Sequence, residues 1–170
     1  MLTKPEPLRI RLTRLNPTHH RFEAIPADGG VTIRELETRS FLTHDLVHYA
    51  LESEAGLTNS FYGQLARGQD HEDMLQPISV EARQTEFVVG PLQTAIMGEV
   101  NAEAFVARIL EVKQQIGGDA PAWLSSELIE RVVKRLRGLQ GRWKATPFGE
   151  TMELVFPPVV FPPVVFPPEA

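Results

Sequence analysis

The residues that decide the fold are Leu8-Arg9-Ile10-Arg11-Leu12, in which apolar side chains alternate with arginines. Successive side chains of a β-strand point to opposite faces of the sheet, so this pattern predicts a strand with one buried and one wet face. A strand with a buried face needs neighbours that complete its hydrogen bonds. The residues that follow in the chain have the patterns of such neighbours.

Two further strands are expected directly after this one. Asn16-Pro17 is typical of a turn, and residues 21–25 have the pattern of a second strand. Asp28-Gly29-Gly30 then predicts a hairpin turn, because these residues tolerate positive φ, and residues 31–37 would form a third strand. We therefore expect residues 8–37 to form an antiparallel meander.

A helix is predicted to follow the meander and to end at about residue 55. Ser40 or Thr43 is expected to cap its N-terminus, since either hydroxyl accepts a hydrogen bond from a free backbone N–H, and Gly56 suits the position after its last turn. Residues three and four apart share a helix face, so this helix has an apolar side and a titratable side. The apolar side holds Leu42, Leu46, Tyr49 and Ala50, and the titratable side holds His44, Asp45, His48 and Glu52.

More helices are expected in the middle of the chain, and strands again near its end. The helical patterns cover residues 59–67, 80–97 with a kink or break at Gly90-Pro91, 101–116 and 126–137, the last ended by Gly138. Residues 142–145 and 151–156 are predicted to form a C-terminal hairpin. The fold class is therefore expected to be α+β, with an antiparallel sheet from the N-terminal meander and the C-terminal hairpin, and four to five helices packed on one face.

The chain is long enough for one domain and ends in a short repeat. Its 170 residues are 42% hydrophobic and 23% charged, which is ordinary for a globular protein. We expect residues 1–156 to form a single globular domain. Residues 157–170 form a proline-rich tail with a Val-Val-Phe-Pro-Pro repeat, and paired prolines there favour an extended or disordered chain.

Composition and charge disfavour several classes of partner and site. A net charge of −5 argues against nucleic acid and anionic lipid as partners, because both require a basic face. The absence of cysteine excludes disulfides, thiolate metal sites and cysteine nucleophiles. No apolar run is long enough for a membrane span or a signal peptide. These features predict a soluble, cytoplasmic protein.

The titratable side of the predicted helix carries the strongest chemical signal. His44 and His48 are four residues apart, so both rings can reach one ion such as zinc or another divalent metal. His71, in a polar segment, is the expected third metal ligand. Asp45 is a candidate general base and, with Glu52, a candidate catalytic residue. Glu52 lies one turn beyond His48, which favours a hydrogen bond that orients the imidazole.

The segment around these histidines resembles one known family. His44-Asp45-Leu46-Val47-His48, followed by Gly56-Leu57-Thr58-Asn59, resembles the HDxxH zinc signature of the ubiquinone (coenzyme Q) biosynthesis protein family. The resemblance implies that His44, Asp45 and His48 are zinc ligands. The family signature continues with a Glu after eleven residues, where this chain has Ser60.

Two classes of function are compatible with these residues. The first is a small metal-dependent enzyme that acts on an unknown small molecule. The second is a non-enzymatic binding or assembly module, with no physiological metal, that contacts a protein partner or a second copy of itself. In a variant of the second class, His44 and His48 respond to pH.

Overall fold

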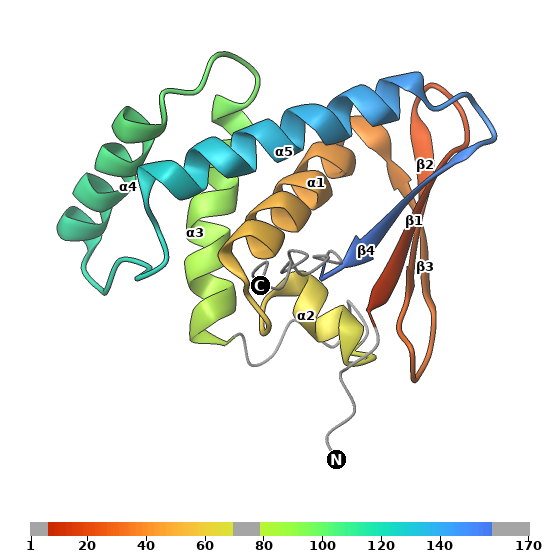
Figure 1. Cartoon of the computed structure of the whole chain (residues 1–170), viewed down its shortest axis with the longest axis horizontal. Helices are drawn as coiled ribbons and strands as arrows, with labels where there is room; N and C mark the ends of the chain where they lie inside the picture. Colours follow the sequence, from red (N-terminus) through yellow and green to blue (C-terminus); the bar gives the residue numbers. More distant parts are fainter. Residues whose placement is uncertain (1–6, 70–78, 158–170) are drawn as a thin grey trace, which may run out of the picture.

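The computed structural model describes residues 7–69 and 79–157, which form an α+β fold with helices on one face of an open antiparallel sheet (Figure 1). The sheet has four strands in the order β3-β2-β1-β4. The strands are β1 (Leu8–Arg14), β2 (His19–Ile25), β3 (Thr32–Glu37) and β4 (Thr151–Phe156). The predicted fold class and N-terminal meander are both confirmed.

The sheet has the two-faced character that the alternation predicts. Leu8, Ile10 and Leu12 are fully buried beneath the helices, while Arg9 points to the other face. That outer face carries ion pairs, such as Arg11 with Glu153, whose Nε and Oε1 atoms lie 3.1 Å apart. The helices therefore cover only one side of the sheet.

Five helices complete the described part of the fold. They are α1 (Thr38–Ala55), α2 (Phe61–Ala66), α3 (Val80–Ala95), α4 (Ala102–Ile116) and α5 (Ser126–Ala145). Gly56 has φ 65° after the last turn of α1, as expected. The predicted caps of α1 are wrong, because the helix starts at Thr38 directly after β3 and Glu37 precedes it without a side-chain cap. Helix α3 continues through Pro91 rather than breaking there.

The predicted C-terminal hairpin is wrong, because residues 142–145 belong to α5. The buried stripe of this helix continues past Gly138 to Leu139 and Trp143. Burial of these side chains outweighs the cost of a helical glycine, which is about 1 kcal/mol. Strand β4 instead pairs antiparallel with β1, with Met152 opposite Leu12.

Helix α1 lies at the centre of the fold and packs against α2, α3, α5 and β3. The hydroxyl of Tyr49 donates to the carbonyl of Val155, 2.8 Å away, which ties α1 to β4. On another side, Glu54 accepts hydrogen bonds from Arg131 and Arg135 of α5. These contacts fix the helix that carries the histidines.

Two predictions fall outside the described residues. These are the third metal ligand, His71, and the proline-rich tail from residue 158 onward. Within residues 7–69 and 79–157, none of the helices has the length and hydropathy needed to span a bilayer.

Candidate metal centre

Both sides of α1 are buried, including the side that carries the titratable residues. Asp45, His48 and Glu52 have exposed fractions of only 5%, 2% and 1%. The apolar residues on the other side, such as Leu46, are buried as predicted. Buried polar side chains are unfavourable unless other groups satisfy them, so the partners of these three residues define the site.

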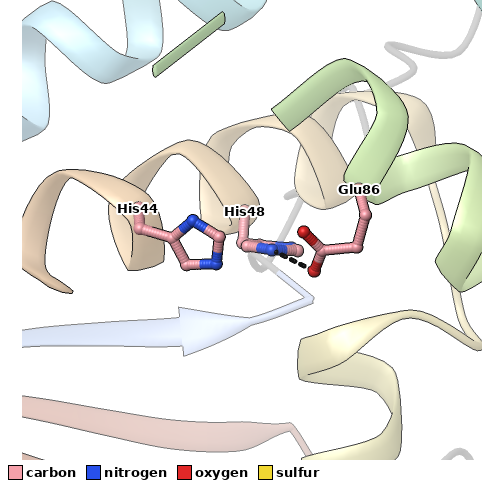
Figure 2. Close-up of side chains that lie close together, drawn as sticks. All are labelled: His44, His48 and Glu86. Carbon is pink, nitrogen blue, oxygen red and sulfur yellow. Dashed lines mark ion pairs between the residues drawn. The ribbon is translucent and has the colours of Figure 1, made fainter. Parts of the chain in front are cut away.

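His48 lies between two carboxylates. Its Nδ1 donates to Oε2 of Glu52 at 2.9 Å, which confirms the predicted contact between these residues. Its Nε2 lies 2.8 Å from Oε1 of Glu86 on α3 (Figure 2). This second contact is close enough for an ion pair, but it is not aligned as a hydrogen bond. Burial lowers the pKa of His48, but the hydrogen bond to Glu52 and the close, negatively charged carboxylates of Glu52 and Glu86 outweigh burial and raise it to about 9.

His44 is oriented in the same way as His48. Its Nδ1 lies 3.1 Å from Oε1 of Gln93, which comes from α3. Carboxylate and amide oxygens only accept hydrogen bonds, so Nδ1 of each histidine carries the proton in these two contacts. Each ring is thereby held through Nδ1 and keeps Nε2 as the nitrogen that can bind a metal.

The two histidines and Glu86 form one cluster. A ligand atom from each of His44, His48 and Glu86 lies within 4.8 Å of the other two, and the imidazole ring centroids are 4.7 Å apart. His44 is half-buried, His48 is buried and Glu86 is exposed, so one side of the cluster faces solvent. Two imidazoles and a carboxylate form a donor set that suits zinc or another divalent transition metal.

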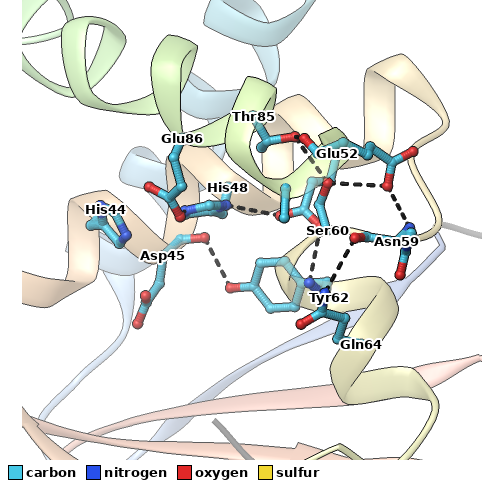
Figure 3. A network of polar contacts seen from close by, with 12 residues as sticks. His44, Asp45, His48, Glu52, Asn59, Ser60, Tyr62, Gln64, Thr85 and Glu86 are labelled. Carbon is cyan, nitrogen blue, oxygen red and sulfur yellow. Dashed lines mark hydrogen bonds and ion pairs between the residues drawn. The ribbon is translucent and has the colours of Figure 1, made fainter. Parts of the chain in front are cut away.

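Glu52 is not one of the three donors of the cluster, but it orients one of them, His48, through a hydrogen bond. Oε2 accepts from His48, and Oε1 accepts from the backbone N–H of Tyr62, 2.9 Å away in the first turn of α2 (Figure 3). The phenol of Tyr62 in turn donates to the backbone carbonyl of Asp45. Helix α2 approaches its own preceding loop closely, since a Cβ on Gly63 would lie 2.1 Å from the carbonyl oxygen of Thr58. The orientation of His48 therefore depends on the seating of α2.

Asp45 belongs to the same helix face and lines a neighbouring cavity. Burial raises the pKa of its carboxyl group to about 7, and the charge of His48 opposes this shift. The cavity lies against the side chains of Phe41 on α1 and Phe61 on α2. Asp45 therefore adds an acid group on the helix that carries the histidines, next to a space that a small molecule can enter.

A second polar network links α2 to α3. The hydroxyl of Ser60 lies 2.9 Å from that of Thr85, and Oε2 of Glu81 accepts from the hydroxyl of Ser60 and the backbone N–H of Asn59. This network holds α3 against the loop that precedes α2. Because Glu86 directly follows Thr85, the network also fixes the position of Glu86 relative to the histidines.

Comparisons with known families, curated proteins and solved structures find no match to this chain. The geometry of the cluster therefore carries the functional argument. The resemblance to ubiquinone biosynthesis proteins stays a prediction. Ser60 occupies the place of the expected Glu and bonds to Thr85, while the acidic donor that groups with both histidines is Glu86.

Proposed function

We propose that this protein binds one divalent transition metal, with zinc as the first candidate, through His44, His48 and Glu86. The observation that carries the proposal is the paired orientation of the histidines: Nδ1 of each donates to a fixed acceptor, Gln93 or Glu52. Hydrogen bonds of this kind from the second ring nitrogen hold histidine ligands in metal proteins. A metal-free role needs no such arrangement at both residues.

Within residues 7–69 and 79–157 the cluster offers three donors, and this number favours a catalytic rather than a structural metal. Structural zinc sites have four protein ligands, whereas catalytic sites have three and leave a position for water or substrate. A metal here would lower the pKa of bound water and polarise a carbonyl group. The exposure of Glu86 leaves an approach to that position from solvent.

The reaction class we propose is hydrolysis of a small ester or amide. The oxygen of water bonds to the carbonyl carbon, and the bond from that carbon to the leaving group breaks. Asp45 takes the proton from the attacking water and returns it to the leaving group. Glu52 has no role in this proton transfer, because both of its oxygens accept hydrogen bonds from His48 and Tyr62.

A metal-free role is the second candidate, and one observation favours it. Nε2 of His48 lies 2.8 Å from Glu86, so a protonated His48 would join α1 to α3 as a buried cation between two glutamates. In that case the cluster stabilises a non-enzymatic module. Removal of either glutamate would then leave His48 with an incompletely compensated buried charge, which is destabilising.

Calorimetric titration with zinc sulfate separates the two candidates. The protein is purified without an affinity tag, stripped with a chelator and compared with Glu86→Gln and the control Glu99→Gln, which changes an exposed glutamate beyond the end of α3. We expect one site in the wild type, at least tenfold weaker binding in Glu86→Gln and no change in the control. Absence of zinc binding in the wild type, or equal binding in Glu86→Gln, would overturn the metal proposal.

The catalytic proposal has its own test. Zinc-loaded wild type and Asp45→Asn are assayed with 4-nitrophenyl acetate, a general ester substrate. Asparagine keeps the shape of Asp45 but cannot carry the proton, so we expect kcat to fall about a hundredfold with zinc affinity unchanged. Equal kcat values would show that Asp45 does not transfer the proton.

A further inference from the structure

A cavity of about 220 Å³ lies beside the metal cluster, between the helices and the outer half of the sheet. Strands β2 and β3 form one wall, and the first turns of α1 and α2 form the other. The residues that line it are Phe22, Thr32, Arg34, Leu36, Phe41, Asp45 and Phe61. Its place beside the cluster makes this cavity a candidate for the substrate site of the proposed metal-dependent function, on which the inference below rests.

The size and walls of the cavity suit a single aromatic ring. An apolar protein cavity of about 150 Å³ is large enough to bind benzene, so this one has room for a substituted ring. Phe22 and Leu36 contribute apolar side chains from the sheet, and Phe61 contributes one from α2. Phe41, at the N-terminal end of α1, is 46% exposed and lies at the edge of the cavity. A phenyl-sized group bound here would lose contact with water over most of its surface.

Two charged side chains of opposite sign line the same cavity. Asp45 contributes a carboxyl group from α1, and Arg34 contributes a guanidinium group from β3. A guanidinium group donates hydrogen bonds and a carboxyl group accepts them, so together they suit an uncharged polar group such as an amide or ester. The polar part of a ligand is therefore expected near Asp45.

Two of the residues that line the cavity, Asp45 and Phe61, adjoin the cluster, although His44, His48 and Glu86 are not themselves part of the lining. Asp45 directly follows His44, and it shares a helix face with His48, three residues later. On the opposite wall, the ring of Phe61 lies against that of His48, with the centroids 5.3 Å apart. A ring that fills the cavity would therefore place an attached carbonyl group on the side of the histidines.

We infer that the substrate is a small neutral molecule in which a phenyl-sized apolar group is joined to an amide or ester carbonyl. The apolar group occupies the cavity among the phenylalanines, and the carbonyl faces Asp45 and the metal cluster. Among hydrolysable molecules, this selects aryl or benzyl amides and esters. It disfavours peptides, sugars and phosphorylated compounds, which are larger or more strongly polar.

The binding of 4-fluorobenzamide, followed by fluorine NMR on metal-free protein, tests this inference. Thr32→Phe fills the cavity from β3, and Ile33→Phe is the matched control, because Ile33 is the next residue, is 58% exposed and points to the other face of the sheet. We expect a dissociation constant on the order of 1 mM for so small a ligand. Binding should weaken at least tenfold in Thr32→Phe and stay unchanged in Ile33→Phe.

The outcomes separate this inference from the metal proposal. Absence of binding to the wild type, or equal binding by Thr32→Phe, would refute the cavity as the substrate site even if zinc binds. Binding blocked by Thr32→Phe supports the cavity even if zinc does not bind, and the function would then be that of a metal-free binding protein.

The titration is repeated with zinc, and a changed fluorine shift of the bound probe would support the inferred orientation. An unchanged shift would contradict it.

Discussion

Two buried histidines of this protein lie in opposite surroundings. His48 has a carboxylate beside each ring nitrogen, and its pKa is raised to about 9. His20 on β2 has the hydroxyl of Thr38 at Nδ1, 3.1 Å away, and Nε2 has no polar partner among the described residues. The ring of Trp143 lies against it, and burial lowers its pKa to about 4, with a smaller contribution from His19.

The difference shows that burial alone does not determine the pKa of a histidine in this fold. Burial removes the charge of His20, as it does for most buried bases. At His48 the fold adds two glutamates that more than offset the same effect. The raised pKa keeps His48 protonated at neutral pH, so a metal ion that binds Nε2 would have to displace that proton. The carboxylates that stabilise the proton would stabilise a metal cation in its place, and two histidines in one such site can share a metal ion.

Replacement of Glu52 should have the largest effect, because it makes the surroundings of His48 resemble those of His20. In Glu52→Gln only one oxygen remains to accept hydrogen bonds from His48 and Tyr62. We expect zinc affinity to fall roughly 10- to 100-fold, and the free energy of unfolding to fall by about 1–3 kcal/mol. Calorimetry and denaturant titration measure the two effects.

The matched control for this change is Glu54→Gln, two residues further along α1. Glu54 pairs with Arg131 and Arg135 near the surface, and in the described part of the chain it lies outside the histidine cluster. Its replacement should leave zinc affinity unchanged and cost less than about 1 kcal/mol. If both variants bind zinc as tightly as the wild type, Glu52 does not orient a metal ligand.

The second prediction concerns the stability of the fold at low pH and is tested by replacing His20. Below pH 6.5 the unfolded chain protonates His20, whereas the folded protein does not until about pH 4. The contribution of neutral His20 is therefore complete above pH 6.5 and is lost as the pH falls toward 4. We therefore compare the difference in unfolding free energy between His20→Phe and the wild type at two pH values. This difference should favour His20→Phe by about 2 kcal/mol more at pH 5 than at pH 8. A difference that is the same at both pH values would contradict the lowered pKa.

The smallest expected effect comes from the aromatic neighbour of His20. The rings of His20 and Trp143 meet edge to face, with centroids 5.8 Å apart. Trp143→Phe keeps an apolar ring at this place but reduces the contact, so we expect a loss of about 1 kcal/mol in unfolding free energy. Zinc affinity should not change, because Trp143 lies outside the metal cluster. A change in zinc affinity would show that the two histidine regions are coupled.

Much of the fold could be predicted from local patterns. The alternation at residues 8–12 and the turn at Gly29 specify the meander, because strand period and turn chemistry act over few residues. The end of α5 could not be found in this way. Gly138 resembles a helix end, but contacts of Leu139 and Trp143 with the core extend the helix beyond it.

The candidate site was predictable only as far as it lies on one helix. The spacing of His44, His48 and Glu52 indicates their shared face, and the contact between His48 and Glu52 is present. Glu86 was missed because it comes from α3, 38 positions after His48, and no local pattern links the two residues. A search for acidic residues on other predicted helices would have proposed Glu86 among several others. Only the packing of α3 against α1 selects it.

The most direct test of the central claim is anomalous diffraction at the zinc absorption edge from crystals of the zinc-loaded protein. The proposed metal centre predicts one strong peak bound by a ring nitrogen of His44, a ring nitrogen of His48 and a carboxylate oxygen of Glu86, each about 2 Å away. A map with no peak at this cluster, or with zinc bound only elsewhere on the protein, would contradict it.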